Sequence, residues 1–337
     1  MLNKNFVNQN TSSQIPRRQS LSLVVPVYNE EEVISEFYKR SIIVLESLAM
    51  DYEILFINDG SKDKTLEKLK ELRDGNNNIA IIDLSRNFGK EVAMTSGLDY
   101  AKGDAAIIID SDLQDPPELI PKFIKYWHEG YDVVYAKRIT RAGETTLKKL
   151  TAYLFYKTMN KVSQVAIPED TGDFRLLSRR AINSIKDLPE RNRFMKGLFT
   201  WIGYAQKEVT YNRDPRFSGE SKWGYWKLWN FALEGITSFT IAPLKLSTYA
   251  GLLTAIFAMS YGLFIIVKTL IYGDPVAGFP TLITVVSLIG GVQLVALGII
   301  GEYLGRMFEE TKNRPLYFVN QYISSELSVE ENQINQK

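Results

Sequence analysis

The sequence contains no cysteine and only one histidine, His128. The lack of cysteine excludes disulfides, thiolate nucleophiles and cysteine-ligated zinc, and it agrees with folding in a reducing compartment. A single histidine excludes every metal site that needs several histidine ligands. Because His128 stands in the polar stretch YWHEG, we expect it to be a solvated surface residue.

An excess of either charge is also lacking, since 40 Lys and Arg residues stand against 39 Asp and Glu residues. The chain therefore has no broad cationic field, which argues against nucleic acid as a partner. Residues 1–20 contain no apolar run like that of a signal peptide. They are rich in Asn, Gln, Ser and Arg, a composition that predicts a disordered N-terminal tail in the cytosol.

An alternation of short apolar runs and amphipathic stretches begins at residue 21. This pattern is typical of a parallel sheet with crossover helices, and hence of an α/β nucleotide-binding domain of Rossmann-like type. We predict strands at 21–29, 52–59, 79–85, 105–110 and 132–138. The alternation then stops, and we expect a helix at 147–162, a loop at 168–178 and further α+β elements, which complete a domain over 21–222.

Two long apolar runs follow, at residues 246–271 and 279–304. Each is long enough to cross a bilayer, which takes about 20 helical residues. Residues 223–241, a basic stretch rich in aromatic side chains, predict an amphipathic helix in the headgroup region, although packing against the catalytic domain explains the same residues. The sequence therefore predicts an integral membrane protein with two transmembrane helices.

Basic residues flank the outer ends of the two apolar runs, and the turn between the runs has none. The positive-inside rule then places the catalytic domain and both termini, including a C-terminal tail over 305–337, on the cytoplasmic side of the plasma membrane. Small residues in the second run let helices approach closely, within one chain or between chains. We also expect a homo-oligomer, with a tetramer as one option.

The motif DSDLQD follows directly after a predicted buried strand. Its carboxylates Asp110 and Asp112, at i and i+2, can both reach one hard divalent cation and leave room for diphosphate oxygens. An acidic loop that only caps the helix beginning at Pro116 explains the same residues.

Two further strand ends carry groups that suit a nucleotide. Asp59 closes the second predicted strand, where its carboxylate can accept a hydrogen bond from a nucleobase or ribose, or serve only the turn. Pro26, Tyr28 and Glu30 end the first strand and offer an aromatic ring and a carboxylate for uracil and ribose. In parallel α/β sheets such strand ends converge on one ligand site.

Five motifs in a fixed order carry a family resemblance: VVPVYNEEEVI, INDGSKDKT, LSRNFGKEVAM, DSDLQDPPELI and DTGDFRLLSR. Together they resemble glycosyltransferase family 2, whose catalytic domain has the GT-A fold. Within that family the chain is similar to polyprenyl-phosphate glycosyltransferases, namely the GtrB-like bactoprenol glucosyltransferases and the related dolichol-phosphate-mannose synthases. The resemblance covers about residues 21–314, because the apolar runs and the segment GIIGEYLGRMFEETKNRP also resemble GtrB-like proteins.

The resemblance assigns roles to individual residues. It implies a nucleotide-sugar site made of Pro26, Tyr28, Glu30, Asp59, Asp110 and Ser111. It implies a site for Mg²⁺ or Mn²⁺ made of Asp110, Asp112 and Gln114. It implies a catalytic carboxylate, Asp173, and acceptor-phosphate contacts at Arg138, Arg216, Ser221 and Lys222.

The implied activity is an inverting transfer of a sugar, with UDP-glucose as the favoured donor, to an undecaprenyl-type polyprenyl phosphate. A phosphate monoester is already largely a dianion at pH 7, so Asp173 is expected to orient the acceptor more than to remove a proton. One alternative is a GDP-mannose-dependent polyprenyl-phosphate mannose synthase. A processive polysaccharide synthase would need more spans than two, and a QxxRW-like motif is absent after TGDFR. A non-catalytic scaffold or flippase component is disfavoured by the retained carboxylates.

Overall fold

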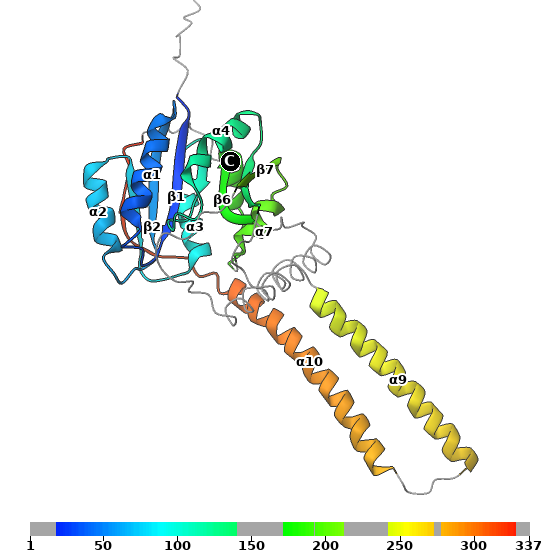
Figure 1. The fold of residues 1–337 in the computed structure, drawn as a ribbon. Coiled ribbons are helices and arrows are strands. Elements are labelled where there is room, and N and C mark those ends of the chain that lie inside the picture. The colour runs from blue at the N-terminus through cyan, green and yellow to red at the C-terminus, as the bar shows by residue number, and fades with distance from the viewer. Residues whose placement is uncertain (1–17, 140–170, 192, 212–241, 273–277, 328–337) are drawn as a thin grey trace, which may run out of the picture.

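The computed structural model describes residues 18–139, 171–191, 193–211, 242–272 and 278–327. A mixed sheet lies between two layers of helices, and two long helices extend away from this domain (Figure 1). The sheet has the strand order β7-β5-β6-β4-β1-β2-β3-β8. Its strands are β1 (Ser20–Val27), β2 (Asp51–Asn58), β3 (Ile79–Leu84), β4 (Ala105–Ile108), β5 (Val133–Arg138), β6 (Thr171–Ser178), β7 (Gln206–Tyr211) and β8 (Val319–Ile323).

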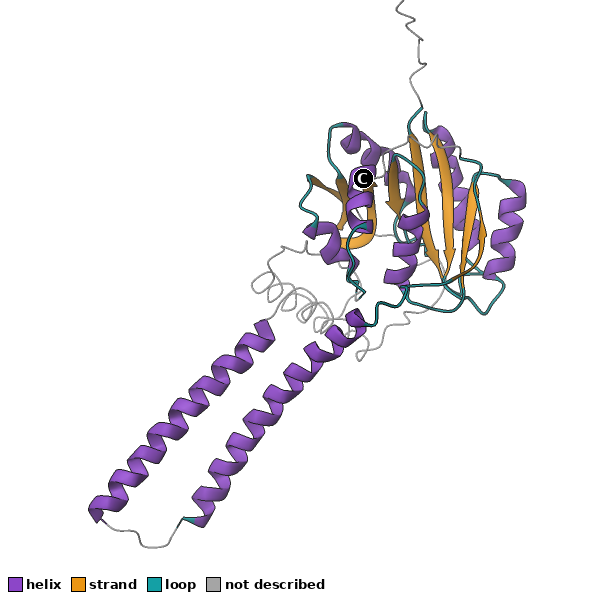
Figure 2. Ribbon diagram, turned by 180° about the vertical axis from the view of Figure 1, so that it is seen from behind, coloured by secondary structure: helices purple, strands orange, loops and turns teal. Residues whose placement is uncertain are grey.

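Helices cover both faces of the sheet, as Figure 2 shows from behind. One face packs against α1 (Ile34–Ser47), α2 (Thr65–Gly75) and α4 (Ile120–His128), and a short 3₁₀ helix (Pro117–Leu119) precedes α4. The other face packs against α3 (Lys90–Tyr100), α6 (Arg179–Lys186) and α7 (Met195–Trp201). The predicted α/β class is therefore confirmed.

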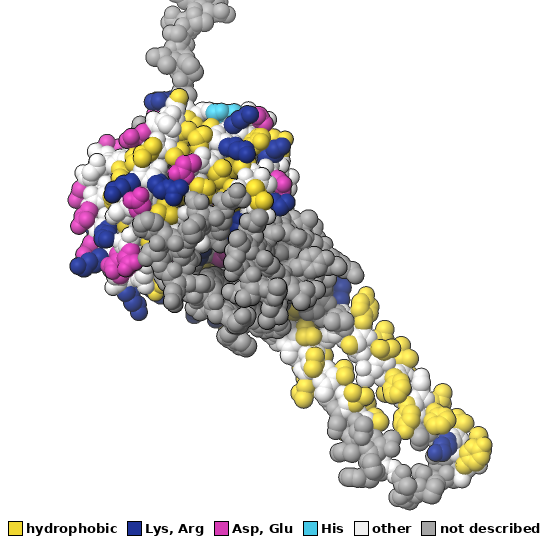
Figure 3. Space-filling model, viewed as in Figure 1, with side chains coloured by type: hydrophobic (Ala, Val, Ile, Leu, Met, Phe, Trp, Pro, Cys, Tyr) yellow, Lys and Arg dark blue, Asp and Glu magenta, His cyan; other side chains and the backbone are white. Residues whose placement is uncertain are grey.

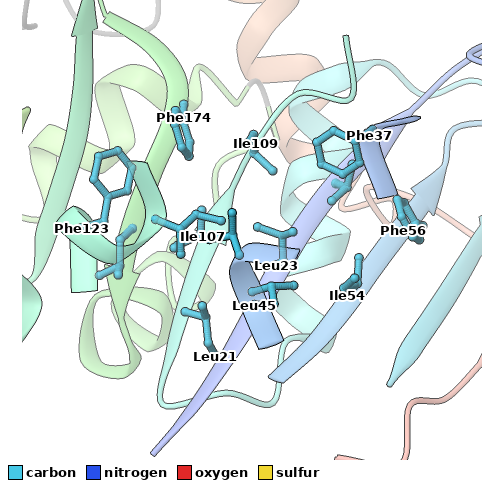
Figure 4. Close-up of a cluster of buried hydrophobic side chains, with 14 of the residues drawn as sticks. Leu21, Leu23, Phe37, Leu45, Ile54, Phe56, Ile107, Ile109, Phe123 and Phe174 are labelled. Carbon is cyan, nitrogen blue, oxygen red and sulfur yellow. The ribbon is translucent and has the colours of Figure 1, made fainter. Parts of the chain in front are cut away.

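Large side chains fill the space between the sheet and the first helical layer (Figure 4). Phe37 of α1 meets Phe56 of β2 edge to face, with ring centroids 6.4 Å apart. Phe123 of α4 packs on Phe174 of β6 at 4.7 Å. Each such buried side chain contributes about 1.5–3 kcal/mol to folding. His128, by contrast, lies exposed at the end of α4, as predicted.

The predicted parallel strands are confirmed, because β1 pairs in parallel with both β2 and β4, and β2 with β3. The prediction of a loop at 168–178 was wrong for its second part, which forms β6. This strand runs antiparallel between β4 and β5, and all eight of its residues are buried. Asp173 and Arg175 lie on one strand face and Phe174 and Leu176 on the other, so the segment does show the period-two alternation of a strand, a signal that the prediction of a loop passed over.

Two antiparallel helices form the part of the molecule predicted to lie in the membrane: α9 (Ala242–Tyr272) and α10 (Phe279–Thr311). With 31 and 33 residues they are longer than the about 20 residues that a bilayer core requires. Segments Ser247–Phe264 and Leu288–Thr311 are apolar enough to cross a membrane. Hydrophobic side chains cover most of the visible described surface of both helices, whereas acidic side chains are seen only on the catalytic domain (Figure 3).

Helix α10 continues past the predicted end of the second span at residue 304. Glu302 and Arg306 form an ion pair of 3.2 Å at i,i+4, and Glu309 and Lys312 form one of 2.6 Å at i,i+3. Such pairs support the helix beyond the apolar run.

The predicted C-terminal tail over 305–337 needs correction, because residues 319–323 form β8, which pairs antiparallel with β3 at the edge of the catalytic sheet. Tyr322 of this strand packs against Tyr100 of α3 with ring centroids 4.7 Å apart. The N-terminal boundary also shifts by one residue, since β1 begins at Ser20. The chain thus returns to the catalytic domain after the helical hairpin.

A buried carboxylate fastens the returning segment. Glu53 of β2 is fully buried and accepts hydrogen bonds from the Ser22 hydroxyl at 2.6 Å, the Lys102 backbone N–H at 2.8 Å and the Ser325 hydroxyl at 2.5 Å. A buried carboxylate is stable only when its oxygens have such donors. Ser325, two residues after the end of β8, therefore completes the hydrogen bonding of Glu53 in the sheet interior.

We predict that Ser325→Ala destabilises the catalytic domain by about 2 kcal/mol, because a buried charged acceptor loses one donor. In a domain of this size the loss corresponds to a fall in Tm of about 4–8 °C, measured by thermal unfolding in neutral detergent. Ser324→Ala, at the exposed neighbouring position, is the control and should stay close to the wild-type Tm. Equal Tm values for both variants would show that Ser325 does not support Glu53.

Candidate active site

The loops after β1 and β2 are joined by hydrogen bonds. The Asn29 backbone N–H donates to the Ser61 hydroxyl at 2.9 Å, and the Glu30 backbone N–H donates to the Thr65 hydroxyl at 2.9 Å. Pro26 lies in β1, and the half-buried Tyr28 and Glu30 follow that strand directly. The predicted nucleotide-binding residues of the first strand thus sit on a braced loop at the carboxyl edge of the sheet.

Asp59 is buried just after β2, and its carboxylate accepts the backbone N–H groups of Phe88 at 2.7 Å and Gly89 at 2.9 Å. Burial raises the pKa of Asp59, and the two N–H groups oppose that shift. Gly60 follows with φ +65°, and a Cβ there would lie 2.5 Å from the Arg86 carbonyl carbon, so only glycine fits. Asp59 therefore fixes the loop that leads into α3, while its contact with a nucleotide stays a prediction.

Lys90, the first residue of α3, joins the two most important predicted carboxylates. Its Nζ lies 2.6 Å from Asp110 Oδ1, 2.7 Å from Asp110 Oδ2 and 2.5 Å from Asp173 Oδ2. The prediction from sequence did not include Lys90, although it belongs to the motif LSRNFGKEVAM. The only sequence feature that could have singled out Lys90 was its place in this motif, because the spacing of residues along the chain does not distinguish it from a surface lysine.

Strand pairing explains why the carboxylates meet. In the antiparallel pairing of β4 with β6, Ile108 lies opposite Arg175. Two positions further on in this register, Asp110 follows Ile108 and Asp173 precedes Arg175. The sheet therefore brings the predicted metal ligand and the predicted catalytic carboxylate to adjacent positions.

The charges in this cluster stabilise one another. Burial alone would lower the pKa of Lys90, but Asp110 and Asp173 raise it, so the ammonium stays charged. Burial alone would raise the pKa of Asp173, but the ammonium groups of Lys90 and Lys196 lower it in sum. Burial raises the pKa of Asp110, and Lys90 opposes that shift. Asp173 is therefore an ionised carboxylate at neutral pH.

Asp173 also keeps one oxygen for another group. Within the described residues, its buried Oδ1 has no hydrogen-bond partner. Such an unsatisfied buried oxygen carries a free-energy cost in a structural role and is typical of functional sites. Asp173 Oδ1 is thus an acceptor that has no partner among the described residues and that could serve a bound substrate.

The loop after β4 contains the remaining predicted metal ligands. Asp112 Oδ1 accepts the Gln114 backbone N–H at 3.1 Å, and Ser111 is buried beneath the loop. The buried Leu113 has φ +60°, a left-handed conformation that is unfavourable for leucine and is held by the surrounding structure.

A divalent cation fits this loop if further ligands come from a bound substrate. Over the described part of the chain, no group of three or more His, Cys, Asp or Glu side chains is placed to hold a metal ion. Asp110 and Asp112 are close enough for the charge of Asp112 to raise the pKa of Asp110. Mg²⁺ is commonly bound by one or two carboxylates together with substrate phosphates, so this pair suits a cation that arrives with a diphosphate.

Arg138, a predicted acceptor-phosphate residue, is oriented by two groups that the sequence did not reveal. Its Nε lies 3.4 Å from the Tyr211 hydroxyl, which in turn donates a short hydrogen bond to Asp115. Burial and Asp115 raise the pKa of Tyr211, so the phenol stays protonated and can donate. A Cβ on Gly172 would stand 3.1 Å from the Arg138 guanidinium, so glycine leaves room for it.

Glu91 lies next to this centre on α3, and its Oε2 accepts the Met195 backbone N–H of α7 at 2.9 Å. Burial and the nearby Asp173 raise the pKa of Glu91 to about 7.

The predicted acceptor residues Arg216, Ser221 and Lys222, and the predicted helix at 223–241, lie outside the described residues.

Comparison with known proteins covers both parts of the chain. Glycosyl transferase family 2 matches residues 22–186, and the GtrB C-terminal hairpin family matches residues 242–307. An uncharacterised glycosyltransferase of Synechocystis is 53% identical over 89% of this chain and 94% of that protein. The SfII prophage-derived bactoprenol glucosyl transferase of Shigella flexneri is 50% identical over 89% of this chain and 97% of that protein. The prophage bactoprenol glucosyl transferase homolog of Escherichia coli is 48% identical over 89% of this chain and 98% of that protein.

Glu91 predicts a pH dependence of stability. Its folded pKa of about 7 exceeds the ordinary value of 4.5, so its contribution is fully present below pH 4.5 and is lost as the pH rises to about 7. Glu91→Gln should flatten the fall of the unfolding free energy over that range by up to about 3 kcal/mol, measured as Tm against pH. Glu67→Gln, on the exposed side of α2, should follow the wild-type curve. A wild-type slope in Glu91→Gln would contradict the assignment.

Proposed function

Because the chain belongs to glycosyltransferase family 2, we propose that it transfers glucose from UDP-glucose to an undecaprenyl-type polyprenyl phosphate at the cytoplasmic membrane face. The observation that carries the proposal is the centre formed by Lys90, Asp110 and Asp173. It stands at the strand ends of a domain that is joined on both sides to a hairpin of apolar helices. Relatives named bactoprenol glucosyl transferase match the domain and the hairpin together, which supports a lipid-linked acceptor.

On the donor side, Pro26, Tyr28, Glu30 and Asp59 line the strand ends proposed for the nucleoside, and Ser111 and Asp110 those proposed for the diphosphate. Asp110, Asp112 and Gln114 would hold Mg²⁺ or Mn²⁺, which when bound neutralises charge on the departing diphosphate.

On the acceptor side, a phosphate oxygen attacks the anomeric carbon from the face opposite the leaving nucleoside diphosphate, which inverts the configuration. Asp173 is ionised and paired with Lys90, and the acceptor phosphate needs little deprotonation at pH 7. Asp173 therefore orients the acceptor in this proposal. Arg138, Arg216, Ser221 and Lys222 bind its phosphate, where an arginine fork suits two oxygens at once.

The membrane part of the proposal keeps the predicted orientation. Both termini and the catalytic domain face the cytoplasm, the segment 223–241 lies in the headgroup region, and the chain forms a homo-oligomer. Protease accessibility in sealed vesicles tests the orientation, and the mass of the detergent-solubilised protein tests the oligomer.

Membranes containing the protein, undecaprenyl phosphate and a panel of labelled nucleotide-sugars test the function. We expect label from UDP-glucose to enter the lipid fraction as a single sugar. Label from GDP-mannose instead would favour the mannose synthase, and label in long chains would favour a processive synthase. No labelled lipid from any donor would leave the non-catalytic scaffold as the remaining alternative.

We predict that Asp112→Asn lowers transfer by at least about 100-fold, because one charge of the proposed metal pair is lost. The half-buried side chain lies in a loop outside the main core, so the Tm should stay near that of the wild type. Initial rates with saturating donor check this, and EDTA should reproduce the loss. Asp74→Asn, at an exposed site on α2, should transfer at the wild-type rate. Full activity of Asp112→Asn in excess chelator would remove the metal from the proposal.

We predict that Tyr211→Phe raises the acceptor KM by about tenfold, because Arg138 loses the hydroxyl that orients it. The donor KM should not change, since Tyr211 lies on the acceptor side in this proposal. Tyr204→Phe removes a hydroxyl that shares a hydrogen bond of 2.8 Å with the Ser184 hydroxyl, and it should leave both constants unchanged. An altered donor KM with an unaltered acceptor KM would place Arg138 on the donor side.

A further inference from the structure

The ammonium of Lys90 engages both oxygens of Asp110, at 2.6 and 2.7 Å. These are the oxygens with which Asp110 would bind a divalent cation. A cation at coordination distance from them would stand next to a second positive charge. Lys90 and a metal ion therefore compete for the same carboxylate.

The described residues also supply too few ligands to win that competition. Over the described residues, no cluster of three acidic or histidine side chains is placed around Asp110. A diphosphate would add oxygen ligands and negative charge, both of which favour a divalent cation over one ammonium.

Lys90 is able to leave Asp110 without a change in the backbone. Asp59 fixes the N–H groups of Phe88 and Gly89 just before it, so the start of α3 stays in place. The lysine side chain is 38% exposed and has four rotatable carbon–carbon bonds. Its contact with Asp173, which is 2.5 Å long, gives it a second carboxylate to remain beside.

We infer that Lys90 is the resident counter-ion of Asp110 in the donor-free protein, and that a divalent cation displaces it only when the cation enters together with the donor diphosphate. The inference deepens the proposed function and rests on it for the identity of the donor. Binding of metal and nucleotide is then coupled, and free metal binds poorly by itself.

Mn²⁺ binding to the full-length protein in neutral detergent tests this, with free Mn²⁺ measured by electron paramagnetic resonance. Wild type should bind Mn²⁺ at least about tenfold more tightly with saturating UDP than without nucleotide, and GDP is titrated in parallel. Lys90→Met should bind Mn²⁺ without nucleotide at least about tenfold more tightly than wild type, because the competing charge is gone. Lys90→Arg, which keeps the charge, should bind it as weakly as wild type.

Lys196→Met is the matched control. Lys196 also lowers the pKa of Asp173, but its Nζ hydrogen-bonds the Thr171 carbonyl at 3.1 Å and makes no described contact with Asp110. Its removal should change Mn²⁺ affinity less than about threefold. An equal gain in Lys196→Met would show a general field effect, and it would overturn the exchange.

Two other results would also overturn it: equal Mn²⁺ affinity of wild type with and without nucleotide, or no gain in Lys90→Met. The wild-type comparison holds even where a variant fails to fold. These measurements do not depend on sugar transfer. If they come out as expected while no donor labels the lipid, the proposed function fails and the exchange stands. If UDP-glucose labels the lipid while the Mn²⁺ affinities do not change, the proposed function stands and the exchange at Asp110 fails.

Discussion

The ammonium of Lys90 holds together two carboxylates, Asp110 and Asp173, that would otherwise repel each other in a partly buried place. Strand pairing brings them to adjacent positions, because β6 runs antiparallel beside β4. Without a cation between them, at least one would have to be protonated or move apart. The geometry of the candidate site therefore depends on one positive charge delivered by α3.

Contacts at both flanks of Lys90 give α3 its position. Asp59 binds the backbone N–H groups that precede the helix, and Glu91 accepts an N–H group at the start of α7. The end of β2 is thereby linked to the start of α7 through residues on both sides of Lys90. A carboxylate such as Asp59, which looks like a ligand in the sequence, therefore has a positioning role in the structure.

The sequence predicted the parallel strands and the strand-end carboxylates, because buried parallel strands are continuous apolar runs and polar residues mark their ends. The prediction missed β6 as a strand, although Asp173 and Arg175 alternate with the apolar Phe174 and Leu176, which is the period-two pattern of a strand. Lys90 was missed because a lysine in the first turn of a helix is normally solvated. Tyr211 reaches Arg138 because β7 pairs with β5, and Tyr211 in turn contacts Asp115. The order of strands in a sheet cannot be read from local sequence patterns, so these contacts were not predicted.

The edge strand β8 shows how a segment with weak local signal can matter for the whole molecule. Its polar sequence VNQYI reads as a tail, yet Tyr322 packs on Tyr100 and Tyr317 donates to Asp99 at 2.8 Å, both at the end of α3. Helix α3 is 11 residues long, about 16 Å, and carries Lys90 at its other end. The segment that follows the apolar hairpin is therefore packed against the same rigid helix that supplies the central charge. If the hairpin were attached only through residues 212–241, the catalytic centre would have a single connection to the two apolar helices. The return of the chain through β8 gives it a second connection. Two connections restrict how far the catalytic centre can turn relative to the helices.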